Sequence, residues 1–207
     1  MKKKRIGIYG GTFSPCHIGH VRVAKAFLRE MKLDLLYVIP AKQPPHKAVS
    51  ADDDPMRRFE MLKIAFRDEP KIEISDIELQ RAGKSYTADT LHSLAAPDRE
   101  LFLLMGTDMF LCLDQWYHAE TIFSLANIVF ARRESLPENT AAIREKLDAY
   151  KTRFGAKIYE IDLPVTELSS SEVRELLAKG EDEAAAACLP DGVFAYVKEH
   201  GCYGTAR

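Results

Sequence analysis

Short apolar runs alternate with amphipathic segments along most of this 207-residue chain, and that alternation is the strongest constraint on its fold. A short apolar run is typical of a strand buried on both faces, and an intervening helix returns the chain for parallel pairing. The pattern predicts an α/β fold, a mostly parallel sheet covered by helices and followed by C-terminal helices. The expected strands are 5–9, 35–39, 71–75, 100–105, 127–131 and 157–161, and the expected helices are 18–32, 56–67, 87–95, 170–179, 182–188 and 191–200.

Length and composition fit one globular domain over residues 1–207, with a helical C-terminal portion at about 168–207. The formal net charge is -2, so no basic field argues for a nucleic-acid partner. No apolar stretch has the length of a secretory signal or a membrane span, so no membrane association is expected. The four cysteines show no paired spacing, which favours a reduced, cytoplasmic setting, and the sequence leaves a homo-oligomer open.

The most informative local feature follows the first expected strand, where two glycines open a loop that leads into a helix. Glycine lets the backbone approach an anion closely, and the N-terminal amides of the next helix attract negative charge. His17 and His20 are three residues apart, so both imidazoles face one spot from the first helical turn. An imidazole N–H donates to phosphate oxygens and stabilises the charge that builds up during phosphoryl or nucleotidyl transfer. This strand exit predicts a phosphate site made of Gly10, Gly11, Thr12, Phe13, Ser14, His17 and His20.

A second candidate anion site lies at the start of the helix expected over 170–179. Ser169, Ser170 and Ser171 are typical N-cap residues, and a capped helix N-terminus attracts anions. Arg174, one turn into the helix, adds a forked guanidinium that suits phosphate oxygens. Capping alone is the simpler interpretation of the serines, and the two roles are compatible.

Two motifs in a fixed order resemble the signatures of the nucleotidyltransferase superfamily, namely GGTFSPCHIGH at 10–20 and LSSSEVR at 168–174. Further matches extend the resemblance, over nearly the whole chain, to the bacterial nicotinate-mononucleotide adenylyltransferases. One departure is plain, because Ser14 stands where the family usually has Asp. A serine still forms hydrogen bonds in the loop but carries no charge. The further matches are PPHK at 44–47, SYTADTL at 85–91, MGTD at 105–108 and WY at 116–117.

The resemblance implies a doubly wound, Rossmann-like nucleotidyltransferase fold. It also implies transfer of the adenylyl group of ATP to nicotinate mononucleotide, by in-line attack without a covalent intermediate, in NAD biosynthesis. His17, His20 and Arg174 would be catalytic by neutralising triphosphate charge, and Mg²⁺ would bind mainly through phosphates, without a dedicated protein metal site. Residues 10–14, Gly106, Asp108 and Ser169–Ser171 would bind ATP, and His46, Lys47, Thr87, Trp116, Tyr117 and Arg132 would bind the acceptor.

Several of these residues also have simpler interpretations. Trp116, the only tryptophan, fits a hydrophobic core as well as it fits a surface that stacks on a pyridine ring. Arg132 follows the expected strand 127–131, and exposure to solvent without a ligand is an equally good interpretation. Asp108 would cap the following helix or approach a metal ion. The acidic run at 52–54 is interpreted as a helix cap and a solvated loop.

Other nucleotide and metal patterns do not fit the sequence. The first strand is not followed by the G-x-G-x-x-G of a dehydrogenase, and the Gly83–Ser85 segment lacks the upstream glycine and strand of a P-loop. Cys16, His17 and His20 would need a further ligand to hold a metal ion. Two alternatives stay open: a transferase for another phosphorylated acceptor, such as phosphopantetheine, and a nucleotide-binding protein without turnover.

Overall fold

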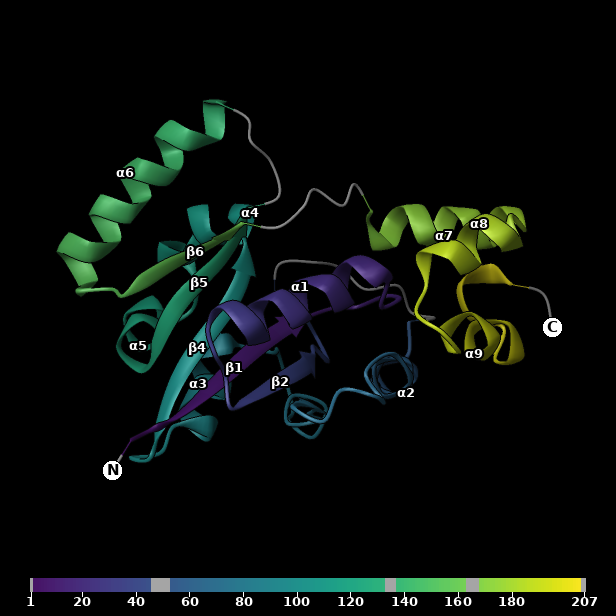
Figure 1. The fold of residues 1–207 in the computed structure, drawn as a ribbon, viewed down its shortest axis with the longest axis horizontal. Coiled ribbons are helices and arrows are strands. Elements are labelled where there is room, and N and C mark those ends of the chain that lie inside the picture. Colours follow the sequence, from purple (N-terminus) through teal and green to yellow (C-terminus); the bar gives the residue numbers. More distant parts are fainter. Residues whose placement is uncertain (1, 46–52, 133–136, 163–167, 206–207) are drawn as a thin grey trace.

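A six-stranded sheet forms the centre of the protein in the computed structural model, which describes residues 2–45, 53–132, 137–162 and 168–205. Each pair of neighbouring strands is parallel, in the order β3-β2-β1-β4-β5-β6 (Figure 1). The predicted α/β class is confirmed, and this sheet is parallel throughout rather than mostly so. The strands are β1 (Lys4–Gly11), β2 (Leu35–Pro40), β3 (Ile72–Ile74), β4 (Arg99–Gly106), β5 (Ala126–Arg132) and β6 (Ile158–Asp162).

The strands contribute side chains to two separate hydrophobic cores, because successive side chains of a strand point to opposite faces of a sheet. In β4, Leu101 and Leu103 belong to one core, and Phe102 and Leu104 to the other. Helices α1 and α2 cover the Phe102 face, whereas α3 to α6 cover the Leu103 face, which makes the sheet doubly wound. These helices are α1 (Ile18–Glu30), α2 (Pro55–Ala65), α3 (Thr87–Leu94), α4 (Thr107–Leu111), α5 (Ala119–Leu125) and α6 (Pro137–Phe154), with a 3-10 turn η1 (Leu113–Gln115) between α4 and α5.

The C-terminal portion is helical, as expected, and packs on α2 at the right of Figure 1. Val173 and Val193 lie in a third core that also contains Met61 of α2. Nη1 of Arg57 in α2 donates to the carbonyl oxygen of His200, 3.2 Å away. The described helices include none that is long and apolar enough to cross a membrane. The portion consists of α7 (Ser170–Lys179), α8 (Asp182–Cys188), α9 (Val193–Glu199) and the 3-10 turn η2 (Cys202–Gly204).

The order of the strands reverses at β1. From β1 the chain adds β2 and β3 on one side of the sheet, and it then crosses over to add β4, β5 and β6 on the other. The connections that leave the carboxyl ends of β1 and β4 therefore run to opposite faces and leave a crevice between them. In doubly wound sheets this switch point is where ligands bind.

Candidate active site

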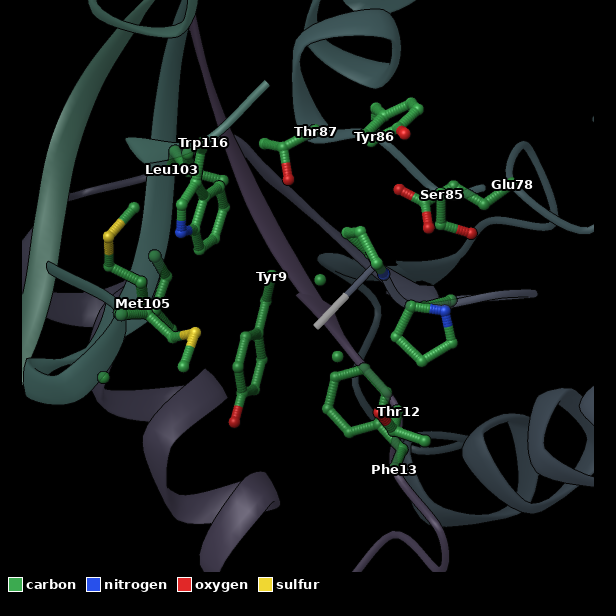
Figure 2. Close-up of a pocket in the computed structure, with 18 of the residues that line it drawn as sticks. Tyr9, Thr12, Phe13, Glu78, Ser85, Tyr86, Thr87, Leu103, Met105 and Trp116 are labelled. Carbon is green, nitrogen blue, oxygen red and sulfur yellow. The ribbon is translucent and has the colours of Figure 1, made fainter. Parts of the chain in front are cut away.

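A cavity of about 620 Å³ opens at the carboxyl ends of β1 and β4, at the switch point of the sheet. Tyr9 lies near its middle, with Thr12 and Phe13 on one side and Trp116 and Met105 on the other (Figure 2). Residues predicted for ATP and for the acceptor thus meet in one cavity. The predicted residues that line it are Gly10, Gly11, Thr12, Phe13, His20, Thr87, Gly106, Asp108, Trp116 and Tyr117.

Glycines shape the side of the cavity formed by residues 10–13. A Cβ on Gly11 would lie 2.9 Å from the ring of Phe13, so this ring position requires glycine. A Cβ on Gly10 or Gly106 would meet no atom within 4 Å, so the backbone of both is open to close approach. Phe13 has a φ of 51°, and its ring packs edge-on against His20 with 5.0 Å between centroids. The loop therefore combines an accessible backbone with a buried aromatic anchor.

The two histidine rings of the loop are in contact, with centroids 3.7 Å apart and planes tilted by 31°. The backbone N–H of His17 donates to Nδ1 of His20 over 3.2 Å, so Nδ1 is an acceptor and a neutral ring carries its proton on Nε2. His20 lines the cavity, whereas His17 is only 4% exposed and lies off the cavity lining. His20 is thereby held in the tautomer that offers an N–H donor, and direct phosphate contact by His17 stays a prediction.

Side chains of the C-terminal portion hold the loop at residues 10–20 through hydrogen bonds. Nη1 of Arg174 donates to the carbonyl oxygen of Ser14 over 2.7 Å, and the Ser170 hydroxyl donates to the carbonyl oxygen of Pro15 over 3.0 Å. The Ser14 hydroxyl donates to the hydroxyl of Tyr203 over 3.4 Å. Ser14, Ser170 and Arg174 all lie off the cavity lining. Arg174 supports the loop at residues 10–20, here called the phosphate loop, and direct contact of Arg174 with phosphate stays a prediction.

The serine run caps α7, in agreement with the simpler interpretation. Ser169 is the N-cap residue: its hydroxyl accepts the N–H of Glu172 over 3.2 Å, and its own N–H donates to the Glu172 carboxylate over 2.7 Å. The hydrogen bonds from the Ser169 hydroxyl and N–H lower the pKa of Glu172. The Ser171 hydroxyl accepts from Nη2 of Arg174 over 3.0 Å. Anion binding by this helix start stays a prediction.

Aromatic rings and a helix start form the side of the cavity opposite the phosphate loop. Trp116 follows η1 and packs in part against the core, so it serves the core and the cavity at once. Thr87 is the first residue of α3, where the backbone N–H groups have no partner within the helix. The rings of Tyr86 and Tyr117 stack with 4.2 Å between centroids and join these two segments. Flat rings beside amide donors suit a planar ring that carries a carboxylate.

Three residues predicted to bind the acceptor have no described place in the cavity. Nη1 of Arg132 pairs with Glu160 at 3.2 Å and Nη2 donates to Thr140 over 2.7 Å, so Arg132 links β5 to β6 and α6. His46 and Lys47 lie outside the described residues. Among the residues that the structure describes, no group of three or more His, Cys, Asp or Glu side chains could hold a metal ion.

Sequence reasoning missed a buried arginine that supports the same loop. Arg58 of α2 is fully buried, donates to the carbonyl oxygens of Thr12 and Ala41 over 2.8 Å each, and pairs with Asp53 at 3.0 Å. Asp54 caps α2 as predicted, but the prediction of a solvated loop is wrong for Asp53, because its carboxylate neutralises a buried cation. No local pattern distinguishes these two residues from ordinary surface charges.

A second missed residue, Glu78, is a buried carboxylic acid on the cavity lining. The Thr90 hydroxyl donates to it over 2.8 Å. Burial raises the pKa of Glu78, while hydrogen bonds from Thr90 and Ser85 and the charge of Arg81 act in the opposite direction. Ser85 also accepts the backbone N–H of Lys42 over 2.9 Å, so the segment that mimics a P-loop instead braces the cavity wall.

Comparisons with known proteins agree with this geometry. Residues 8–176 match the family described as cytidylyltransferase-like. Proteins of Listeria monocytogenes and Clostridium tetani, each named "Probable nicotinate-nucleotide adenylyltransferase", are 34% identical to this chain over 98% of it, and over 98% and 100% of their own lengths. A solved structure of Plasmodium falciparum nicotinic acid mononucleotide adenylyltransferase complexed with NaAD has a TM-score of 0.79 at 21% identity, with 98% of both chains covered. At that identity the likeness shows a shared fold.

Proposed function

The chain belongs to the cytidylyltransferase-like family, among its nicotinate-nucleotide adenylyltransferases, and from that premise we propose how its cavity works. The enzyme transfers the adenylyl group of ATP to nicotinate mononucleotide, which yields nicotinate adenine dinucleotide and pyrophosphate. One observation carries the assignment of the cavity: the loop that contains Thr12 and Phe13 faces an aromatic wall with Trp116 across Tyr9 (Figure 2), and His20 lines the same cavity. A phosphate chain fits the first side and a flat ring fits the second.

The reaction depends on positioning and charge stabilisation. An oxygen of the acceptor 5′-phosphate attacks the α-phosphorus of ATP, and the bond from that phosphorus to the bridging oxygen breaks, with its electron pair leaving on pyrophosphate. The attacking phosphate is largely ionised at neutral pH, so no general base is required. Holding both reactants in line supplies up to roughly 7–11 kcal/mol of barrier reduction.

His20 and the loop backbone form the ATP side of the cavity. The Nε2–H of His20 donates to a phosphate oxygen, where negative charge increases in the transition state. Arg174 and Arg58 support this side indirectly. Arg174 holds the carbonyl oxygen of Ser14 in place, and Arg58 holds that of Thr12. Their charge also favours an anion in the loop.

Magnesium would arrive with ATP and supply further charge neutralisation on the triphosphate. Asp108 is an exposed carboxylate on the cavity lining, in the first turn of α4. One carboxylate beside phosphate oxygens and water is the donor set that Mg²⁺ prefers. We therefore propose Asp108 as the protein group closest to that ion.

The acceptor occupies the other side of the cavity, with its pyridine ring against Trp116. A ring stacked on indole contributes about 0.5–1.5 kcal/mol beyond its buried area. The N–H groups at the start of α3, near Thr87, are donors that suit the nicotinate carboxylate. The amide of nicotinamide mononucleotide would leave such donors poorly satisfied, at a cost of about 1–3 kcal/mol for each unpaired group.

Pyrophosphate release from MgATP with a panel of acceptors tests this proposal. We expect nicotinate mononucleotide to exceed nicotinamide mononucleotide in kcat/KM by at least about tenfold, which is 1.4 kcal/mol. Equal values for the two would contradict the preference for the acid and leave adenylyl transfer standing. Turnover with phosphopantetheine alone would favour the alternative acceptor, and ATP binding without turnover of any acceptor would favour a binding protein.

A further inference from the structure

The wall that carries Trp116 is fastened from outside the cavity by two side chains of α6. Nζ of Lys146 lies 2.9 Å from both carboxylate oxygens of Asp114, and the Tyr150 hydroxyl lies 3.0 Å from one of them. Lys146 and Tyr150 are four residues apart, so they face the same side of the helix. Asp114 lies in η1, two residues before Trp116. The cluster therefore joins α6 to the turn that presents Trp116.

The α6 end of this cluster is fixed in the core. Tyr150 is 1% exposed, and its ring packs against those of Phe110 and Phe123 at centroid distances of 5.3 and 4.9 Å. Its hydroxyl also lies 2.9 Å from the carbonyl oxygen of Phe110 and accepts the backbone N–H of Asp114 over 3.4 Å. The hydroxyl is thus a fixed point between α4 and η1. The Asp114 carboxylate docks on that point and on the Lys146 ammonium.

The chain that follows η1 brings Trp116 and Tyr117 to the cavity, and the Tyr117 ring is held separately by its stack on Tyr86. Trp116 lines the cavity, whereas Asp114, Lys146 and Tyr150 lie off its lining. Leu113, on the core side of Asp114, is fully buried and belongs to the same core as Tyr150. A change at Asp114 therefore reaches the substrate through the placement of Trp116.

We propose that Asp114, held by Lys146 and Tyr150, is a positioning residue that sets the place of Trp116 and thereby the KM for the acceptor. The inference rests on the proposed function, which assigns the Trp116 ring to the pyridine ring. The ATP side of the cavity is held separately, by Arg58 and by the C-terminal portion. Release of Asp114 should therefore weaken acceptor binding and spare ATP.

The test compares Asp114→Asn with a matched control, Asp182→Asn. Asp182 pairs with Lys198 in the same forked geometry, with distances of 3.2 and 3.0 Å, between α8 and α9. Asn keeps the size of the side chain and removes its charge in both variants. Steady-state kinetics give KM for each substrate and kcat. Because Trp116 is the only tryptophan, its fluorescence and acrylamide quenching report its placement directly.

For Asp114→Asn we expect KM for nicotinate mononucleotide to rise about tenfold, with KM for ATP and kcat changed less than about threefold. Tryptophan emission should shift and quenching should increase, while far-UV circular dichroism stays that of wild type. Asp182→Asn should match wild type in every kinetic and fluorescence readout. Lys146→Met, which keeps the aliphatic stem, should move KM and fluorescence in the same direction as Asp114→Asn.

Unchanged KM and unchanged fluorescence in a folded Asp114→Asn protein would overturn the inference. An equal rise in both KM values would also overturn it, because it would indicate general loosening. The fluorescence comparison stands apart from catalysis. If wild-type enzyme failed to use nicotinate mononucleotide, the proposed function would fail, and the quenching of Asp114→Asn would still decide whether Asp114 places Trp116.

Discussion

At the residue scale, the backbone N–H of His17 determines which nitrogen of His20 can donate to a phosphate. His20→Ala removes the Nε2–H donor, and we expect kcat to fall by roughly 10²–10³ in a folded protein. Two closer substitutions separate the ring atoms. Gln can place its amide N–H near Nε2 and should retain part of the activity, whereas Asn reaches only the Nδ1 position and should match Ala. Asn as active as Gln in single-turnover adenylyl transfer would refute a role for Nε2.

The same scale applies to Ser14, which is 5% exposed and hydrogen-bonded to Tyr203. Tyr203 accepts in this bond, and burial raises the pKa of its phenol, so the phenol keeps its own O–H at neutral pH. A carboxylate at position 14 could therefore accept its O–H, and we expect Ser14→Asp to stay within about tenfold of wild-type kcat. In a Tyr203→Phe background the buried carboxylate would lack this donor. Adding Ser14→Asp to Tyr203→Phe should therefore lower the free energy of unfolding in urea by about 1–3 kcal/mol relative to Tyr203→Phe alone. Additive effects in the double-mutant cycle would rule out the contact.

At the scale of elements, α6 stabilises η1 through a carboxylate that titrates. Desolvation opposes ionisation of Asp114, but hydrogen bonds from Lys146 and Tyr150 and the Lys146 charge outweigh it and lower its pKa. The stabilisation is therefore complete above the unfolded pKa of about 3.9, and it is lost as pH falls through the folded value. We expect Asp114→Asn to cost at most about 1 kcal/mol at pH 7, because solvent screens the pair, and less at pH 3.5. A cost in urea unfolding that is equal at both pH values would contradict this.

The elements also differ in how far sequence reveals them. The buried strands are continuous apolar runs, so their pattern was readable, and β3 was found although only Ile72–Ile74 pair. No range was predicted for α4, η1, α5 or α6; a helix was expected after Asp108, but Gly106 is the N-cap residue of α4 and Asp108 lies in its first turn. Helix α4 and the turn η1 are too short to show helical periodicity, and α6 buries only a narrow stripe that includes Ile143 and Tyr150.

The site divides in the same way. The loop at 10–20 could be predicted because its glycines and histidines are adjacent in sequence, and Trp116 because it is unique. The roles of Arg58 and Asp114 could not be predicted, because their partners lie far away along the chain. Arg58 and Thr12 are 46 residues apart in sequence, and Lys146 and Asp114 are 32 residues apart. Side chains that support a site through tertiary contacts leave no local pattern.

At the scale of the whole molecule, the phosphate loop joins the sheet to the C-terminal helices. Arg58 reaches it from α2 and Arg174 from α7, while Met61 of α2 is buried in the C-terminal core. Neither part can open without breaking contacts that hold the loop. We therefore expect the 207 residues to unfold as one cooperative unit, so that far-UV and near-UV circular dichroism transitions coincide.

ATP should stabilise that whole unit, because the loop it binds is held by both parts. A ligand at a hundred times its Kd adds about 2.7 kcal/mol to the unfolding free energy, which for a chain of this size raises Tm by roughly 5–10 °C. The shift should move a single calorimetric transition. Arg174→Lys keeps the charge but loses the planar fork that grips Ser14 and Ser171, so the ATP-induced shift should shrink. Two transitions, of which ATP moves only one, would show that the C-terminal helices unfold independently of the site.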